Sequence, residues 1–281
     1  MGTLNKISTG ERLEFYNYGD VTVEHLHRYA IALDFIKNKK VLDIASGEGY
    51  GSFLLSSKAE LVYGVDIDAT SIKNATLKYK NHNLKFIEGA AAKIPLENNS
   101  VDVVVSFETI EHHDQHDEMM LEIKRVLTSD GILIMSSPDK EYYSDKTGQK
   151  NKFHIKELYL QEFKDLISKY FEEAFFLYQK SYNLNSFVAD EQFYYIDLYY
   201  GDNLGISKKI YEPLYNIVIA SDLKQYPIKP SFFNGENISK LVLESNKIKI
   251  RDSTSYRIGN LIVKPFFELK KTIKILLNKK D

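Results

Sequence analysis

The chain has 281 residues, a formal net charge of −2 and no cysteine. This length suffices for one enlarged domain with a substantial core, or for a domain with a tail. The near-neutral charge gives no signal for nucleic-acid binding, and the lack of cysteine excludes a disulfide scaffold and any cysteine-ligated metal site. No stretch is apolar enough to span a bilayer, and the first residues hold no long apolar segment, so we expect a soluble cytoplasmic protein.

The N-terminal segment, residues 1–40, is expected to form a lid and a cap helix. Residues 11–20 are polar and aromatic without a clean period, which predicts a loop or lid. From Val23 onward, apolar residues recur close to helical spacing, so a helix is expected to lead into the first strand.

Three glycines follow the first predicted strand. Residues 41–51 read Val-Leu-Asp-Ile-Ala-Ser-Gly-Glu-Gly-Tyr-Gly, and a helix-like pattern resumes at Ser52. A strand, a tight turn and a helix start bring backbone N–H groups up to a ligand. We expect glycines at 47, 49 and 51 because a Cβ there would block the turn or a close ligand approach. The second strand, 61–66, ends in Asp66. Its separation in sequence from the glycine turn is about that at which an acidic residue hydrogen-bonds the ribose hydroxyls in nucleotide-binding folds.

Two cofactor classes compete for this unit. The dinucleotide fingerprint is G-x-G-x-x-G, whereas this chain has G-x-G-x-G, with Asp43 four positions before the first glycine. The spacing argues against a pyrophosphate ligand and therefore disfavours a nicotinamide-dependent oxidoreductase.

These motifs resemble those of the class I S-adenosylmethionine-dependent methyltransferases. The resemblance continues through Ile-Pro-Leu at 94–96, Ser-Val-Asp at 100–102 and Leu-Thr-Ser-Asp-Gly at 127–131, and it spans residues 12–180. It implies an α/β fold with a Rossmann-like sheet over residues 41–222, mostly parallel with an antiparallel last strand. S-adenosylmethionine is the implied cofactor and S-adenosylhomocysteine the product.

The resemblance also implies cofactor contacts. Asp43 would help to hold the methionine part, and Asp66 would take the two ribose hydroxyls. Many relatives carry an acid for the adenine amino group where this chain has Ala90, so we expect adenine to be held by backbone groups near Ala91 and by Ile67 and Ile94. The full set of expected cofactor contacts is Asp43, Ala45, Gly47, Gly49, Gly51, Asp66, Ile67, Ala91 and Phe107.

Acceptor chemistry is expected just after the buried strand that the β-branched run at 101–106 predicts. The carboxyl end of such a strand faces the ligand crevice, and residues 107–117 are rich in carboxylates and histidines. Methyl transfer needs an aligned acceptor and often loss of a proton, a task that suits histidine. We predict His112 as the general base, with His113 as second choice. Alternatively, Glu108 pairs with a cation to brace the pocket, and an already ionised acceptor needs no base.

A metal site is the other interpretation of this stretch. His112 and His116 lie four apart and can share a helical face, where Glu108 or Glu111 would join them. No second cluster with ligand spacing accompanies them, so no metal is predicted.

A narrower resemblance connects residues 106–119, Ser-Ser-Pro-Asp-Lys at 136–140 and residues 151–158. These runs look like methyltransferases of bacterial surface-polysaccharide clusters, for O-antigen and capsule. The implied reaction is O-methylation of a sugar, a sugar nucleotide or a phosphate- or phosphoramidate-type group. His154 would be a further catalytic histidine, unless it merely packs the following helix. The expected acceptor contacts are Tyr16, Tyr18, His25, Arg28, Tyr142, Tyr143 and Tyr195, with Arg28 favoured because guanidinium suits phosphate or carboxylate.

Two further segments are set apart by composition. Residues 181–213 form a Tyr- and Phe-rich insertion before the last strand, 215–221, and can line an acceptor site, make an oligomer contact or join the core. Residues 223–281 form a C-terminal helical extension with a basic amphipathic end. Such a tail is a candidate to rest on the anionic inner face of a membrane, to dock a glycan-assembly partner or second copy, or to remain disordered.

The sequence therefore predicts an enzyme acting on a small molecule or glycan precursor, not on nucleic acid. The alternatives are a non-catalytic S-adenosylmethionine-binding scaffold in glycan assembly, a small-molecule N-methyltransferase, and the oxidoreductase disfavoured above.

Overall fold

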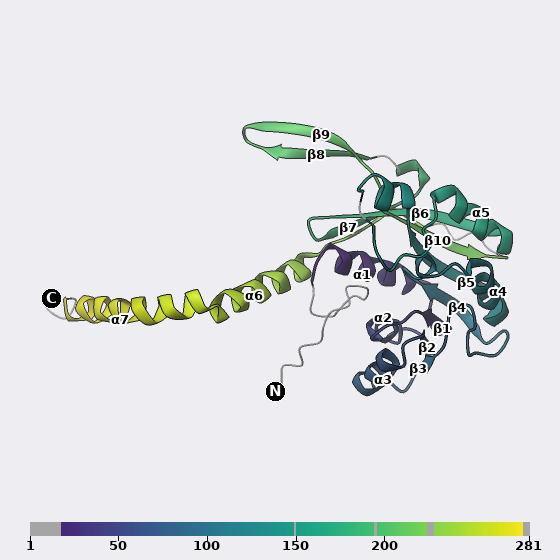
Figure 1. Cartoon of the computed structure of the whole chain (residues 1–281), viewed down its shortest axis with the longest axis horizontal. Helices are drawn as coiled ribbons and strands as arrows, with labels where there is room; N and C mark the ends of the chain where they lie inside the picture. The colour runs from purple at the N-terminus through teal and green to yellow at the C-terminus, as the bar shows by residue number, and fades with distance from the viewer. Residues whose placement is uncertain (1–17, 149, 194–195, 224–227, 278–281) are drawn as a thin grey trace. The chain divides into compact units, whose positions relative to one another are not determined.

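The computed structural model describes residues 18–148, 150–193, 196–223 and 228–277. It divides into two compact units, residues 1–234 and 235–281. Within the described part of the first unit, nine strands form one sheet in the order β11-β7-β6-β10-β5-β4-β1-β2-β3, and β8 and β9 form a second sheet (Figure 1). The elements of this unit are α1 (Asp20–Ala32), β1 (Lys40–Ile44), α2 (Tyr50–Leu55), β2 (Leu61–Asp66), α3 (Ala69–Lys78), β3 (Leu84–Glu88), β4 (Val101–Ser106), η1 (Ile110–His112), α4 (His116–Val126), β5 (Leu127–Pro138), η2 (Glu141–Asp145), α5 (Leu160–Tyr170), β6 (Glu173–Tyr182), β7 (Asn185–Ala189), η3 (Glu191–Phe193), β8 (Ile196–Asp202), β9 (Gly205–Tyr211), β10 (Tyr215–Ser221) and β11 (Ser231–Phe233).

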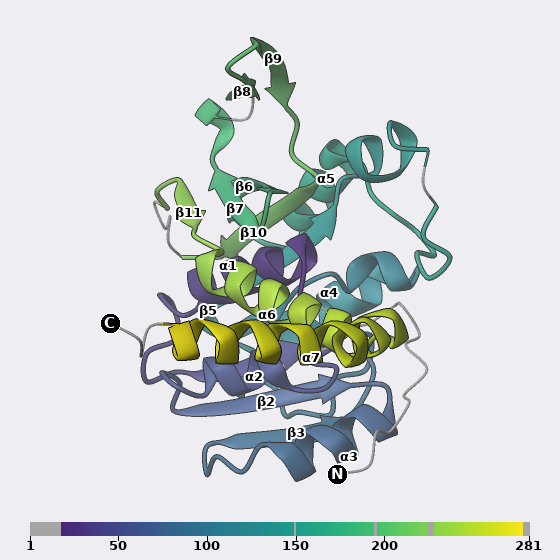
Figure 2. The ribbon, with the colours of Figure 1, turned by 90° about the vertical axis from the view of Figure 1, so that its left-hand side faces the viewer.

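The sheet has the predicted mixed topology. β1 pairs in parallel with β2 and β4, and the parallel order continues to β3 and β5 at either side. β10 lies antiparallel to both β5 and β6. The expected mostly parallel sheet with an antiparallel last strand is confirmed, and Figure 2 shows β2 and β3 at one edge with α3 alongside.

Helices cover both faces of the sheet because neighbouring strand residues point to opposite sides. On β1, Val41 packs into the cluster shared with α1 and α2, whereas Leu42 packs into the cluster shared with α4 and α5. α4 is amphipathic and buries Met119, Met120, Ile123 and Val126 against the sheet. This two-sided cover fixes the strands, whose carboxyl ends then carry the loops of the site.

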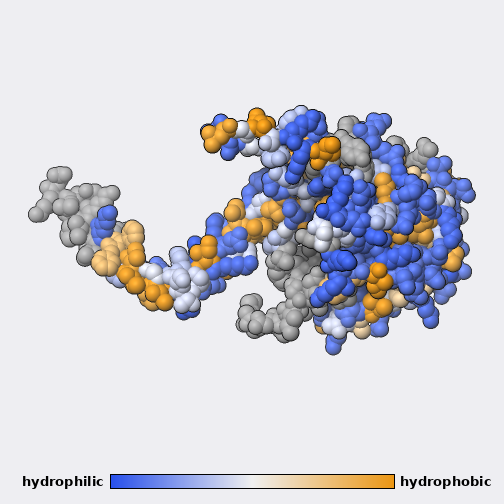
Figure 3. Space-filling view, turned by 45° about the horizontal axis from the view of Figure 1, so that its top comes forward, coloured by the Kyte–Doolittle hydropathy of each residue, from blue (hydrophilic) through white to orange (hydrophobic). Residues whose placement is uncertain are grey.

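The aromatic insertion is present between β6 and β10. It contains β7, which forms a hairpin with β6, and the separate β8–β9 hairpin. Apolar side chains at the tip of that hairpin are exposed, with Leu204 at 91% and Ile206 at 79%. Figure 3 shows orange atoms, which mark hydrophobic residues, at the end of this projecting hairpin. β11 pairs with β7, so the sheet extends beyond residue 222. Tyr195 and Tyr16, two of the expected acceptor contacts, lie outside the described residues.

The second unit is helical, as expected for the C-terminal extension. It consists of α6 (Glu236–Asp252) and α7 (Thr254–Leu277), with Pro265 inside α7. Across the part of the chain that the structure describes, none of the helices has both the length and the apolar character to cross a bilayer.

Candidate active site

The glycine turn after β1 is fastened to the end of β2. Both oxygens of the Asp66 carboxylate accept backbone hydrogen bonds, from Gly47 N–H at 2.8 Å and from Asp68 N–H at 2.9 Å. Gly47 has a φ of +53°, and no atom lies within 4 Å of the position that a Cβ would take. The turn therefore presents an open backbone at Gly47, where a ligand can approach closely.

The other two glycines face the protein instead. A methyl group on Gly49 would fall 2.5 Å from the Phe86 ring, and one on Gly51 would fall 2.0 Å from the Tyr29 hydroxyl. Glycine is therefore required at these two positions because Phe86 and Tyr29 pack against the turn and leave no room for a Cβ.

Asp43 lies behind this turn and is buried. Its carboxylate accepts a hydrogen bond from Ser52 Oγ at 2.6 Å and one from the Tyr29 hydroxyl at 3.3 Å. Burial raises the pKa of Asp43 to about 7, partly opposed by these two hydrogen bonds. Asp43 does not line the pocket itself but holds Tyr29, which does.

A pocket of about 570 Å³ lies at the carboxyl ends of β1, β2 and β4. Ten of the predicted site residues line it, which are His25, Ala45, Gly47, Asp66, Ile67, Ala91, Phe107, Glu108, His112 and His113. The predicted residues Asp43, Gly49, Gly51, Tyr18, Arg28, Tyr142, Tyr143 and His154 are described by the structure but do not line this pocket. Ile94, expected against adenine, is buried in the core beside α4.

Ser46 and Tyr50 are among the pocket residues that sequence reasoning missed. Ser46 directly precedes the first glycine of the turn and Tyr50 lies between the second and the third, and the sequence motif gave neither side chain a role. Among the described residues, neither Ser46 Oγ nor the Tyr50 hydroxyl has a hydrogen-bond partner, although both atoms are buried. Buried polar groups are normally hydrogen-bonded, so these two atoms fit a polar ligand held against the turn.

The acceptor side of the pocket begins after β4. Glu108 has a φ of +52°, in the left-handed region that non-glycine residues seldom adopt. Ser136 Oγ donates to it at 2.7 Å, and Arg28 Nη1 lies 3.3 Å away. Arg28 is 1% exposed, donates to Gln179 at 2.6 Å and lies over the Tyr215 ring. The cation that braces Glu108, one of the two expected roles of that carboxylate, is therefore Arg28.

The histidines of this edge have different surroundings. His112 Nδ1 donates to the Phe153 carbonyl oxygen at 3.1 Å. His113 Nε2 lies 3.3 Å from Met119 Sδ, and burial lowers the pKa of His113. His25 lines the far side, and burial lowers its pKa to about 3, so it is neutral at pH 7. His116 Nε2 donates to the His113 carbonyl oxygen at 2.9 Å.

The link after β5 packs behind η1. His154 stacks on Tyr143, with ring centroids 5.3 Å apart, and meets the His112 ring edge-on at 5.2 Å. Tyr142 is buried under Lys146. This link thus supports the wall of the pocket that carries His112.

With this geometry in hand, similarity to known proteins identifies the class. A family model described as a methyltransferase domain matches residues 36–193, more than half of the chain, and the chain belongs to this family. A "Probable S-adenosylmethionine-dependent methyltransferase" of Mycobacterium tuberculosis is 34% identical over 130 residues, 46% of this chain and 47% of that protein. A phthiotriol/phenolphthiotriol dimycocerosates methyltransferase of Mycobacterium leprae is 29% identical over 109 residues, 38% of this chain and 40% of that protein.

The chain spans about half the length of the curated relatives it matches most strongly. Among solved structures, the YcgJ protein of Bacillus subtilis aligns with a TM-score of 0.51 at 16% identity, covering 71% of this chain and all of that one. This likeness supports the Rossmann-like fold. The chain thus contains a methyltransferase domain that uses S-adenosylmethionine and releases S-adenosylhomocysteine, as expected.

Proposed function

We propose that the protein methylates an oxygen of a polar small molecule, such as a sugar, a sugar nucleotide or a phosphate-bearing precursor of a surface glycan. The observation that carries this proposal is the polar character of the pocket wall beyond Phe107. That wall consists of Glu108, Thr109, His112, His113 and Gln115, with His25 opposite. Side chains of this kind orient hydroxyl or phosphate groups and offer little to a hydrocarbon chain.

The cofactor would occupy the glycine-turn side of the same pocket. Asp66 would take the ribose hydroxyls, and residues 89–92 with Ile67 would enclose adenine. Ser46 Oγ and the Tyr50 hydroxyl would bond the polar methionine end, which supplies the partners that they lack within the described protein. When bound, S-adenosylmethionine supplies an electrophilic methyl carbon on a positively charged sulfur.

The acceptor then needs alignment and, for a hydroxyl, loss of a proton. Because the Phe153 carbonyl can only accept, His112 carries its proton on Nδ1 and leaves the lone pair on Nε2. A neutral histidine in this tautomer can take the acceptor proton at Nε2. Arg28 and Ser136 hold the Glu108 carboxylate beside it and keep that part of the wall rigid.

A lipid acceptor is the second candidate. It is favoured by the similarity to the Mycobacterium leprae enzyme, which is named for phthiotriol and phenolphthiotriol dimycocerosates. A hydroxyl at the end of a lipid would still meet the same polar wall, so the two candidates differ in what lies outside the pocket.

The test is production of S-adenosylhomocysteine by purified protein on two acceptor panels. One panel contains sugar nucleotides, glycosides and sugar phosphates, and the other contains long-chain alcohols, fatty acids and phenolic lipids. Turnover on the first panel only supports the proposal, and turnover on the second only replaces it with the lipid reaction. Cofactor binding without turnover on any acceptor would favour the non-catalytic scaffold.

A matched pair of variants then tests the base. His112→Gln should lower turnover by about 10²–10⁴-fold with cofactor affinity unchanged. His82→Gln, a change at an exposed histidine outside the pocket, should leave turnover unaltered. Equal rates in both variants on a hydroxyl acceptor would remove His112 from the mechanism.

A further inference from the structure

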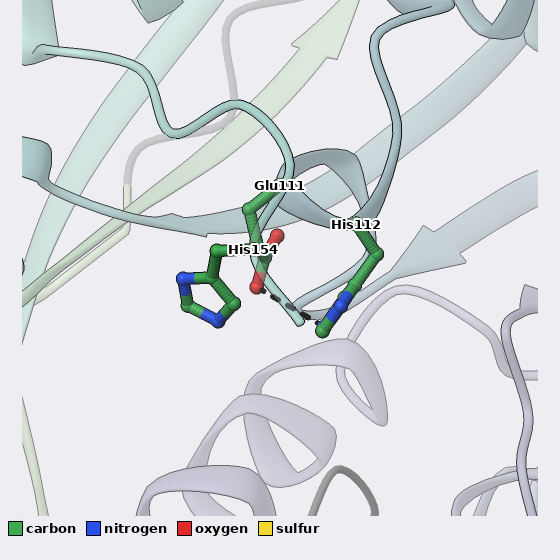
Figure 4. A group of neighbouring side chains, drawn as sticks. All are labelled: Glu111, His112 and His154. Atoms are coloured by element: carbon green, nitrogen blue, oxygen red, sulfur yellow. Dashed lines mark ion pairs between the residues drawn. The ribbon is translucent and has the colours of Figure 1, made fainter. Parts of the chain in front are cut away.

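Glu111, His112 and His154 converge behind the acceptor wall of the pocket. One potential ligand atom from each residue lies within 4.8 Å of those of the other two. Figure 4 shows the carboxylate of Glu111 between the two imidazole rings, with the ion pair to His112 dashed. Glu111 and His112 come from η1, and His154 comes from the link before α5.

The Glu111 carboxylate receives no hydrogen bond from another described residue. The residue is 1% exposed, and among the described residues its own backbone N–H is the one hydrogen-bond donor that favours the ionised form. Its nearest cationic candidate is His112, with Nε2 at 3.9 Å from Oε1. A carboxylate is costly to bury in this way unless a cation compensates it.

Both imidazoles are fixed through the nitrogen that faces away from Glu111. His154 Nδ1 donates to Glu157 Oε1 at 2.5 Å, and His112 Nδ1 donates to the Phe153 carbonyl oxygen at 3.1 Å. These partners only accept, so the neutral form of each ring would carry its lone pair on Nε2. A histidine that binds a metal ion almost always donates its other N–H to a carboxylate or a carbonyl in this manner.

The backbone holds the two segments together. Ile155 N–H and Lys156 N–H both donate to the Glu111 carbonyl oxygen, at 2.8 and 3.1 Å. The His154 segment is therefore anchored on η1 without the help of the three side chains. Their convergence follows from this anchoring.

We propose that Glu111, His112 and His154 bind a divalent transition-metal cation of the Zn²⁺ type. Two imidazole nitrogens and one carboxylate oxygen form a donor set that suits such ions, whereas Mg²⁺ prefers oxygen ligands. Bonds of about 2.0–2.2 Å place ligand atoms about 3.3 Å apart in a tetrahedral site, so the separations between the ligand atoms need to shorten by at most about 1.5 Å.

The cation would take part in the O-methylation proposed above, and this role rests on that proposed function. His112 belongs both to the cluster and to the pocket wall, so a fourth ligand position can face the acceptor. The acceptor hydroxyl would lose its proton to solvent water on binding the cation. Its oxygen would then bond to the methyl carbon while the carbon–sulfur bond breaks, with the electron pair remaining on sulfur. His112 would act as a metal ligand in place of a general base.

The test is direct titration of the full-length protein, stripped with a chelator, with Zn²⁺ by calorimetry and with Co²⁺ by visible absorption. We expect one saturable site with a Kd below about 10 μM, and visible bands of nitrogen-coordinated Co²⁺. His154→Gln and Glu111→Gln should each weaken binding at least about 100-fold, and Glu157→Gln about 10–100-fold. The matched control is His116→Gln, a neighbouring histidine outside the cluster, which should keep wild-type affinity.

S-adenosylmethionine affinity and circular dichroism report whether each variant is folded. No saturable Zn²⁺ site in the wild type, or wild-type Zn²⁺ affinity in a folded His154→Gln, would overturn the proposal. If Glu111→Gln does not fold, His154→Gln decides alone. A Zn²⁺ site with the expected variant pattern but no turnover on any acceptor would refute the proposed reaction and leave the metal site standing.

Discussion

Arg28 Nη1 lies 3.3 Å from Glu108 Oε1, with the Arg28 side chain wholly shielded from solvent and its guanidinium 4.3 Å from the centre of the Tyr215 ring. This pair joins α1, the helix whose start lines the pocket, to the acceptor wall after β4. Arg28 Nη1 and Nη2 have no hydrogen-bond partner among the described residues, so the buried charge is compensated first by the ion pair with Glu108, with Glu24 as a further carboxylate acting on it. The relationship makes Arg28 a brace of the pocket.

Removing one partner of the Arg28–Glu108 ion pair should lower the stability of the folded protein. Glu108→Ala leaves the Arg28 charge buried, and we expect the free energy of unfolding to fall by about 3–5 kcal/mol in urea denaturation at pH 7. The double variant Arg28→Met with Glu108→Gln removes both charges and should recover at least half of that loss. A double variant less stable than Glu108→Ala would contradict the brace.

Asp43 predicts a pH-dependent stability. Its pKa is raised from 3.8 to about 7 in the fold, mainly by burial, so the folded protein keeps a proton that the unfolded chain has already lost. The contribution of Asp43 to stability is therefore fully present below about pH 4 and is lost as pH rises toward 7.

Asp43→Asn removes that dependence. In the cofactor-free protein at pH 8, its melting temperature should exceed that of the wild type by several degrees, and the difference should shrink toward pH 4. The same variant should bind S-adenosylmethionine more weakly, because the negative charge behind Tyr29 is gone. If the melting temperatures of the wild type and Asp43→Asn differ by the same amount at every pH between 4 and 8, Asp43 is already ionised in the folded protein.

Gly51 should not tolerate a methyl group. Gly51→Ala places Cβ 2.0 Å from the Tyr29 hydroxyl, which is buried and bonded to Asp43. We expect a loss of about 1–3 kcal/mol in stability, together with weaker cofactor binding as Tyr29 is displaced. Gly259→Ala is the control, because no atom lies within 4 Å of its Cβ position, and it should be neutral or slightly stabilising. Equal stability of the two variants would place Tyr29 away from the turn.

The sequence carried enough local information to predict that the glycine turn and Asp66 lie together at one side of the pocket. The turn at 45–51 and Asp66 are read from strand patterns and glycine spacing, and Gly47 and Asp66 are hydrogen-bonded across adjacent strand ends. The mostly parallel sheet with an antiparallel last strand followed from the resemblance that these motifs carry, whereas the order of the strands comes from the structure.

The acceptor half depends on contacts between distant segments, which local patterns do not encode. Arg28 was predicted as an acceptor contact, yet it is buried and its guanidinium contacts Gln179 and Glu108. His112 and His116 have helical spacing, but η1 ends at His112 and α4 begins at His116, so they do not share one helical face. The partner that the fold brings to His112 is His154, from beyond β5.

The central claim is that S-adenosylmethionine binds at the carboxyl ends of β1 and β2, with Asp66 as its ribose contact. The most direct test is calorimetric titration of the wild type, Asp66→Asn and Asp102→Asn with S-adenosylmethionine, S-adenosylhomocysteine and NAD. Asp102 is the matched control, because its carboxylate also accepts a backbone hydrogen bond, from Lys40 N–H at 2.8 Å, but lies outside the pocket. We predict that both methionine-derived ligands bind to the wild type and to Asp102→Asn, and bind at least about 10-fold more weakly to Asp66→Asn, since a hydrogen bond to a charged group is worth about 1.5–3 kcal/mol. Unchanged affinity in Asp66→Asn, or binding of NAD alone, would contradict the account.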